Sequence, residues 1–304
     1  MINLKTIRRF FSRCGAWVGI QLCSLIVMVI PQKCLYAFAR GAGKLAYFFA
    51  IRHRNLALES LNIAFGKEKS PEEIKKIAND CFVDIAKGAV ELMFFFDKPH
   101  LLDKMVDIVG KEYLDKALAK GKGVILVSAH FGNFPLLLGR LAVAGYKAGG
   151  IMKPMHDAKM EEIFRKKREK YGVRTIYSQP RNTCVNETIQ ALRNNELIFI
   201  PIHQNFGTGG IFVNFFGQKA ATATGPVILA RRTNAALVVC FIIRHADNRH
   251  TIIFEPEVEL EDAPDSHQAV LINIQKLTDI IELYIRKYPA HWGWIHRRWK
   301  SKPG

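Results

Sequence analysis

The pattern of apolar and polar positions changes near residue 52. Beyond it, short apolar runs alternate with segments whose apolar residues recur every three or four positions, which predicts buried strands alternating with amphipathic helices. Strands are predicted at 124–128, 148–152, 174–177, 197–201, 236–244 and 250–260. Helices are predicted at 55–65, 70–96, 114–120, 158–171, 184–194, 225–233 and 266–288. This alternation predicts an α/β fold, with a mainly parallel sheet flanked by helices.

Before residue 52 the pattern is that of a membrane-associated segment. An uncharged, mostly apolar stretch, 14–32, lies between basic residues, and no Asp or Glu precedes Glu59. Such flanking predicts a segment that spans or lies on an anionic leaflet, and the aromatic stretch 35–51 predicts an interfacial helix. The alternative is a buried helical hairpin. We therefore expect a membrane anchor over residues 1–51 and a catalytic domain over 52–304.

The composition of the chain limits the classes of partner and cofactor that we expect. The chain has 44 Lys and Arg against 27 Asp and Glu, a net charge of +17, which favours an anionic partner. No helix-turn-helix, zinc-finger or RNP pattern occurs, so nucleic acid is not expected. The six cysteines form no CxxC pair, and no metal or dinucleotide motif is present. We expect a reducing cytosolic setting, with no metal and no cofactor.

The strongest chemical signal follows the first predicted strand. The sequence 128–135, SAHFGNFP, would place His130 on a glycine turn at the mouth of the sheet, where α/β enzymes hold their reactive groups. A neutral imidazole there can act as a general base. Main-chain N–H groups of Gly132 and Asn133 could hold an oxyanion, and Asn133 is also expected to cap the next helix.

Other candidates lie after later strands. Lys153 and Arg168 could bind phosphate or the oxyanion. Gln204 and Asn205 are either substrate contacts or turn formers, and His203 is either a second titrating group or structural. Tryptophans alternate with basic residues near the C-terminus, as in Trp294 and Arg298, which is typical of a membrane interface.

Five blocks in order resemble the late acyltransferases of lipid A biosynthesis, the lauroyl and myristoyl transferases of the bacterial inner membrane. They are RHRNL…NIAF (52–65), HFGN (130–133), KP (153–154), FFG…ATATGP…LAR (215–231) and WIHRRWKSKP (294–303). The resemblance covers nearly the whole chain. It implies a cytosol-facing, membrane-bound enzyme that moves an acyl chain from acyl carrier protein to a lipid hydroxyl; the sequence leaves CoA open as the donor.

The chain departs from the family pattern in its carboxylates. The family has His, four residues, then Asp or Glu, and here that position is Pro135. The carboxylate normally orients the imidazole and stabilises the imidazolium. Lys153 replaces an Arg, and Asp157 lies where the family has Asn. Either a backbone carbonyl, Asp157 or nothing takes over the orienting role, or the protein is a catalytically degenerate homologue that binds lipid or a partner.

Overall fold

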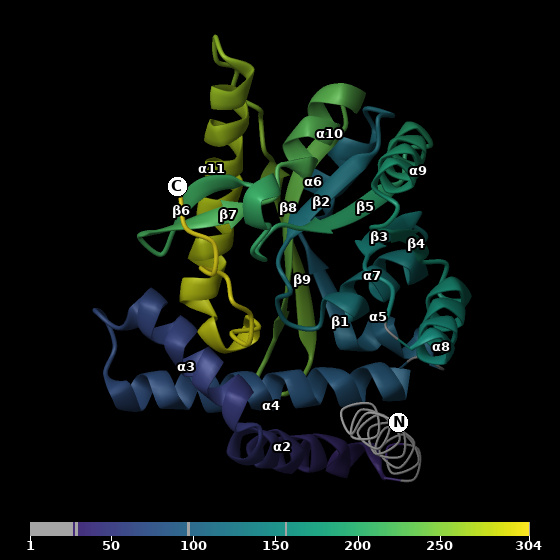
Figure 1. The fold of residues 1–304 in the computed structure, drawn as a ribbon. Coiled ribbons are helices and arrows are strands. Elements are labelled where there is room, and N and C mark those ends of the chain that lie inside the picture. The colour runs from purple at the N-terminus through teal and green to yellow at the C-terminus, as the bar shows by residue number, and fades with distance from the viewer. Residues whose placement is uncertain (1–26, 28–29, 96–97, 156, 304) are drawn as a thin grey trace, which may run out of the picture.

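The structure is a computed structural model that describes residues 27, 30–95, 98–155 and 157–303. A seven-stranded sheet has the order β1-β9-β8-β2-β5-β3-β4 (Figure 1). Its strands are β1 (Val106–Val109), β2 (Val124–Ser128), β3 (Ala148–Met152), β4 (Arg174–Tyr177), β5 (Leu197–Pro201), β8 (Ala236–Arg244) and β9 (His250–Glu257). All neighbours pair in parallel except β8 and β9. The predicted α/β fold with a mainly parallel sheet is confirmed.

Helices cover both faces of the sheet. They are α2 (Gln32–Phe49), α3 (Ile51–Phe65), α4 (Pro71–Phe95), α5 (Leu102–Met105), α6 (Lys111–Leu118), α7 (Phe134–Val143), α8 (Ala158–Lys170), α9 (Arg181–Arg193), α10 (Gly225–Thr233) and α11 (Ser266–Lys287). Single-turn 3₁₀ helices are η1 (Pro99–Leu101), η2 (Gly207–Gly209) and η3 (Pro289–His291).

Alternate residues of β2 show how the layers form. Ile125 and Val127 pack into a core with α3, α4, α9, α10 and α11, whereas Val124 and Leu126 pack into a second core with α5, α6 and α7. Every residue of β2 is buried, because a central parallel strand is covered on both sides. The strand therefore holds the residues after Ser128 in a fixed position at the carboxyl end of the sheet.

Most element boundaries lie within a few residues of the predictions. The helix start at Ser70 is a capping box, in which Ser70 and Glu73 exchange hydrogen bonds. The pattern missed β1 and the hairpin of β6 (Ile211–Phe215) and β7 (Gln218–Thr222), which pairs outside the main sheet. Short strands of this kind give little periodic signal.

The N-terminal prediction is tested only in part. Most of the apolar stretch 14–32 lies outside the described residues. Within the described part, none of the helices combines the length and apolar character that crossing a bilayer requires. Helix α2 packs against α4 and leaves Leu45, Phe48 and Phe49 exposed at its end. Figure 1 shows α2 beneath α4, at the bottom of the molecule.

The C-terminal prediction of a membrane interface is wrong. Trp292, Trp294 and Trp299 are buried, and the Arg298 side chain is only 1% exposed. These side chains pack against one another and against Phe215 and its hairpin, so they form core rather than surface. A sequence in which aromatic and basic residues alternate is compatible with either environment.

Candidate active site

His130 lies on a turn that glycine alone can form. Gly132 has φ of +53°, and an added Cβ would lie 2.2 Å from the main-chain oxygen of Ile242 on β8. The Gly132 N–H donates to the main-chain oxygen of His291 at 2.7 Å, and Phe131 forms a bridge with Trp292. Strand β2 and the C-terminal segment therefore hold the turn from opposite sides.

Three histidine rings meet at this turn. The centroid of the His130 ring lies 4.8 Å from that of His203 and 6.0 Å from that of His296, and the latter two are 5.8 Å apart. The main-chain N–H of His130 donates to Nδ1 of His203 at 3.1 Å. His203 is thus a neutral acceptor at Nδ1. Burial is the main cause that lowers its pKa well below the usual value, and His130, His296 and Arg298 add to it.

No carboxylate contacts the His130 ring within the described part of the chain, and its Nδ1 atom is buried without a hydrogen-bond partner. Burial, with a smaller contribution from His296, lowers the pKa of His130 to about 4. The imidazole is therefore neutral at cytosolic pH. Asp157 does not orient it, because that carboxylate accepts the N–H groups of Lys159 and Met160 as the cap of α8.

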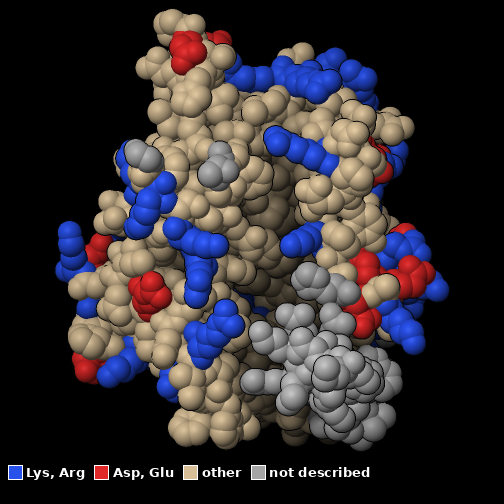
Figure 2. Space-filling model, viewed as in Figure 1, with Lys and Arg blue, Asp and Glu red and all other residues tan. Residues whose placement is uncertain are grey.

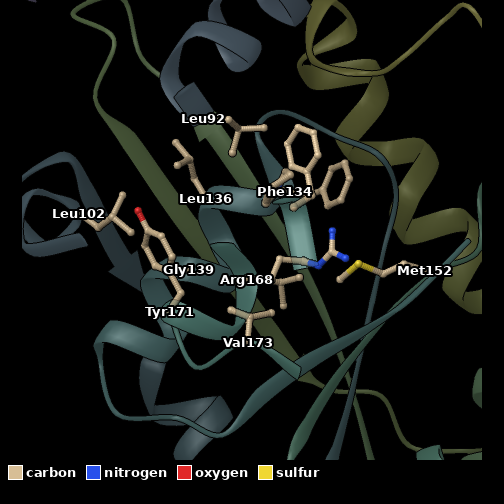
Figure 3. A pocket seen from close by; sticks show the side chains of 12 residues that line it. Leu92, Leu102, Phe134, Leu136, Gly139, Met152, Arg168, Tyr171 and Val173 are labelled. Atoms are coloured by element: carbon tan, nitrogen blue, oxygen red, sulfur yellow. The ribbon is translucent and has the colours of Figure 1, made fainter. Parts of the chain in front are cut away.

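An apolar cavity of about 220 Å³ lies beside the start of α7, and Phe134 separates it from the His130 ring. Phe134 forms part of its wall, and its ring makes an edge contact with the His130 imidazole at 4.7 Å. Figure 3 shows apolar side chains from α4, α7 and β3 around this space, with the Arg168 guanidinium pointing toward Met152. Pro135 lies in the same wall, so the position of the family's acid is occupied by an apolar surface. The shape and lining suit a hydrocarbon chain.

A buried carboxylate lies on α4 near this turn, and it contacts Asn133 instead of the His130 ring. Glu91 of α4 is fully buried and accepts hydrogen bonds from Asn133 at 2.9 Å, from His250 at 3.0 Å and from Arg244. Arg244 also contacts Asp84 at 2.7 Å. Burial acts to raise the pKa of Glu91, but the contacts with His250, Arg244 and Asn133 outweigh it and lower the pKa to about 2. The carboxylate is ionised and fixes Asn133.

The predicted site residues are placed as follows. The Asn133 side chain does not cap α7, although the residue lies at the cap position, because its amide faces Glu91 and Gly88. Lys153 follows β3 and is exposed. Arg168 lines the apolar cavity but is paired with Glu161 at 2.6 Å.

The loop after β5 carries Gln204 and Asn205, and it brings Gln204 to the histidines. Nε2 of Gln204 lies 3.5 Å from Nε2 of His296, and Oδ1 of Asn205 is buried without a partner among the described residues. Arg298 donates to the main-chain oxygens of Gln204 and Ala221 and so holds this loop. Burial lowers the pKa of Arg298 to about 10, and its hydrogen-bond acceptors in the described chain are neutral oxygens.

Sequence reasoning missed Glu91, Arg244, His250 and His296. Glu91 carried a usable signal, since it is the only charge between Lys87 and Asp97 in the apolar run of a predicted helix. A lone acid in such a run requires a buried partner. Arg244 and His250 are paired across β8 and β9 next to the loop that joins these strands, and they gave no comparable signal.

An α/β fold with a histidine-bearing turn close to an apolar cavity suits an enzyme that binds acyl chains. A family model described as "Bacterial lipid A biosynthesis acyltransferase" matches residues 2–301, so the chain belongs to this family and is an acyltransferase. It is 28% identical to the lipid A biosynthesis lauroyltransferase of Escherichia coli over 94% of this chain and 92% of that protein.

Two further relatives are named for other acyl chains or other lipids. The lipid A biosynthesis palmitoleoyltransferase of the same organism is 27% identical, over 94% of this chain and 91% of that protein. A phosphatidylinositol mannoside acyltransferase of Mycolicibacterium smegmatis is 25% identical, over 65% of this chain and 64% of that protein. The chain is therefore similar to enzymes named for different glycolipids.

Proposed function

We propose that the protein transfers a fatty acyl chain from acyl carrier protein to a hydroxyl of a lipid A precursor or related glycolipid, with His130 as general base. The observation that carries this proposal is the edge contact between the His130 ring and Phe134, a wall residue of the apolar cavity. A chain held in that cavity would have its carbonyl carbon near the imidazole. Family membership supports the reaction class.

His130 alone can carry out both proton transfers that the reaction requires. The imidazole takes the proton of the lipid hydroxyl, whose oxygen attacks the thioester carbonyl carbon. When the carbon–sulfur bond breaks, the imidazolium returns the proton to the departing thiolate. We assign the oxyanion contact to the N–H of Asn133 at the start of α7, since the N–H of Gly132 already donates to His291. Lys153 and Arg168 supply positive charge near the substrate, with Gln204 and Asn205 as further polar contacts.

Replacing His130 with Ala tests the proposal. We expect the transfer rate to fall by about 10²- to 10⁴-fold, the range for loss of a general base. The matched control is His267→Ala, an exposed histidine at the start of α11, which should leave the rate unchanged. Purified acyl carrier protein and CoA thioesters, compared as donors, identify the carrier. Turnover that survives His130→Ala would refute the assigned base.

The pH profile is a second readout of the same residue. The pKa of His130 lies near 4 because burial disfavours the imidazolium, so the neutral base persists at every pH above that value. We expect kcat/KM to stay level from pH 8 down to about 5 and to fall only below it. A fall centred near pH 6.5 would instead indicate an ordinary, solvated imidazole at the site.

A degenerate, lipid-binding homologue is the second candidate. It is favoured by the absence of a carboxylate on His130 within the described chain and by a pKa that makes the imidazole a weak base. This candidate predicts no turnover with either donor, together with retained binding of lipid vesicles. The transfer assay therefore separates the two.

We also propose that the catalytic domain, 52–304, lies at the cytoplasmic face of the bacterial inner membrane, with residues 1–51 as its anchor. Support comes from the end of α2, where Leu45 is 60%, Phe48 65% and Phe49 72% exposed, and from the basic net charge. Phe48→Ser should weaken cosedimentation with anionic vesicles several-fold. Leu283→Ser, equally exposed on α11, is the control and should have no effect.

A further inference from the structure

A second, polar cleft opens on the other side of the catalytic turn. It has a volume of about 560 Å³ and shares no lining residue with the apolar cavity. Its walls come from α2, α4, the turn after β8 and the end of η3. Basic side chains dominate the lining, and they are Arg40, Lys44, Lys76, Lys87 and Arg244.

The carboxylates in the cleft do not balance these cations. Asp80 is paired with Lys76 at 2.8 Å and Asp84 with Arg244 at 2.7 Å. Within the described chain Arg40, Lys44 and Lys87 have no carboxylate partner. Nζ of Lys87 donates to the neutral Oδ1 of Asn248 at 2.6 Å. Burial is the main cause that lowers the pKa of Lys87. The charges of Arg244 and Arg40 lower it further, and those of Asp84 and Glu91 offset only part of this effect. An anion in the cleft would relieve this repulsion.

The chemistry of the lining selects the anion. Several cations converge on one concavity, and one terminal nitrogen of the buried Arg244 guanidinium has no hydrogen-bond partner in the described structure. Converging Lys and Arg groups of this kind suit the several oxygens of a phosphate. Among the described residues of the lining there is no Phe, Tyr or Trp on which a nucleobase would stack.

The position of the cleft on α2 indicates where that phosphate comes from. Arg40, Lys44 and Phe48 follow one another at intervals of four residues, so they share a helix face. Phe48 is 65% exposed beyond the two cations. Cations in a cleft beside an exposed apolar side chain match a lipid, whose phosphate and hydrocarbon are joined in the same order.

We propose that this cleft binds the phosphate-bearing headgroup of a lipid at the membrane surface. The proposal rests on the membrane association proposed above. The occupied cleft adjoins the catalytic turn at two places. His291 lines the cleft and accepts the Gly132 N–H, and Arg244 contacts Glu91, which fixes Asn133. The headgroup site and the acyl cavity thus flank the turn that carries His130.

The test uses the full chain and three kinds of vesicle: phosphatidylcholine alone, phosphatidylcholine with phosphatidate, and phosphatidylcholine with oleate at matched surface charge. The double variant Arg40→Gln/Lys87→Gln should bind phosphatidate vesicles roughly tenfold more weakly than the wild type. It should lose far less affinity for oleate vesicles. His130→Ala should keep the wild-type preference for phosphatidate, because the cleft lies outside the transfer chemistry.

The control is Lys122→Gln/Arg193→Gln. It removes two exposed cations that precede β2 and β5, at the amino ends of these strands and so away from the cleft. It should stay within about twofold of wild type for every vesicle. Equal losses in the two double variants, or equal losses for phosphatidate and oleate, would overturn the proposal. So would tight binding of inorganic phosphate in the cleft without any effect of the variant on vesicles. A wild type that binds no vesicle would instead refute the membrane association itself.

Discussion

His130 and Asn133 are three residues apart, and their surroundings are opposite. The ring of His130 meets two other histidines and a phenylalanine, without a carboxylate in the described structure. The amide of Asn133 meets Glu91, which is ionised and also holds His250 and Arg244. In this chain the buried acid supports the backbone of the turn rather than the imidazole. The His130 imidazole is positioned by its main chain and by packing.

This contrast separates two tasks that one carboxylate usually combines. Holding a histidine in place needs only a rigid turn, and Gly132, His291 and Glu91 supply it. Raising the basicity of the ring needs a negative charge beside it, and here burial instead lowers the pKa of His130 to about 4. We expect the site to be well ordered and its base to be weak.

The largest expected effect is on stability. Glu91→Gln removes the charge that Arg244 and His250 face in the core, and loss of one partner from a buried charged network costs about 3 kcal/mol or more. Urea unfolding at pH 7 measures this cost. Glu59→Gln, an exposed acid on α3, is the control and should change the free energy of unfolding by less than about 0.5 kcal/mol.

The same pair of variants gives a pH test. The folded pKa of Glu91 is about 2, below the unfolded value near 4.5. Its charge therefore stabilises the fold fully above about pH 4.5, and that contribution is lost as the pH falls toward 2. The difference between wild type and Glu91→Gln should shrink from pH 7 to pH 3. A difference that is independent of pH would mean that the carboxylate is not ionised in the fold.

Gly132→Ala is expected to have the next largest effect. The added Cβ would have to displace the oxygen of Ile242 from 2.2 Å, in addition to adopting positive φ. Gly121→Ala is the matched control, since Gly121 also has positive φ (+67°) but has open space around it. Positive φ alone costs about 1 kcal/mol, and we expect Gly132→Ala to cost at least about 2 kcal/mol more in thermal or urea unfolding. Equal costs would show that the turn is adaptable.

Pro135→Glu is expected to have the smallest effect, and it tests whether a carboxylate beside His130 would strengthen the imidazole as a base. It returns a carboxylate to the first turn of α7, where the helix dipole also favours an acid. A charge near the imidazole should raise the pKa of His130 from about 4, which NMR titration of the ring protons measures. The transfer rate should rise by about tenfold as the base strengthens. Pro135→Gln controls for loss of the proline and should change neither quantity.

The sequence predicted the fold class, most of the elements and the turn at His130, because apolar runs and glycine turns are local signals. The Glu91 network joins α4, α7 and the β8–β9 turn, and no local pattern reports which distant partner satisfies a buried acid. The error at Trp292–Trp299 has the same origin. Aromatic and basic residues in alternation suit a membrane surface or a packed core, and only the hairpin β6–β7 against them decides between the two.

The C-terminal segment completes the turn that carries His130. The main-chain oxygen of His291 receives the Gly132 N–H, and Arg298 fixes the loop of Gln204 from residues close to the end of the chain. During synthesis the strand that bears the imidazole leaves the ribosome long before these residues do. The turn around Gly132 therefore cannot reach its final form on a nascent chain before residues 291–298 have left the ribosome and packed against it.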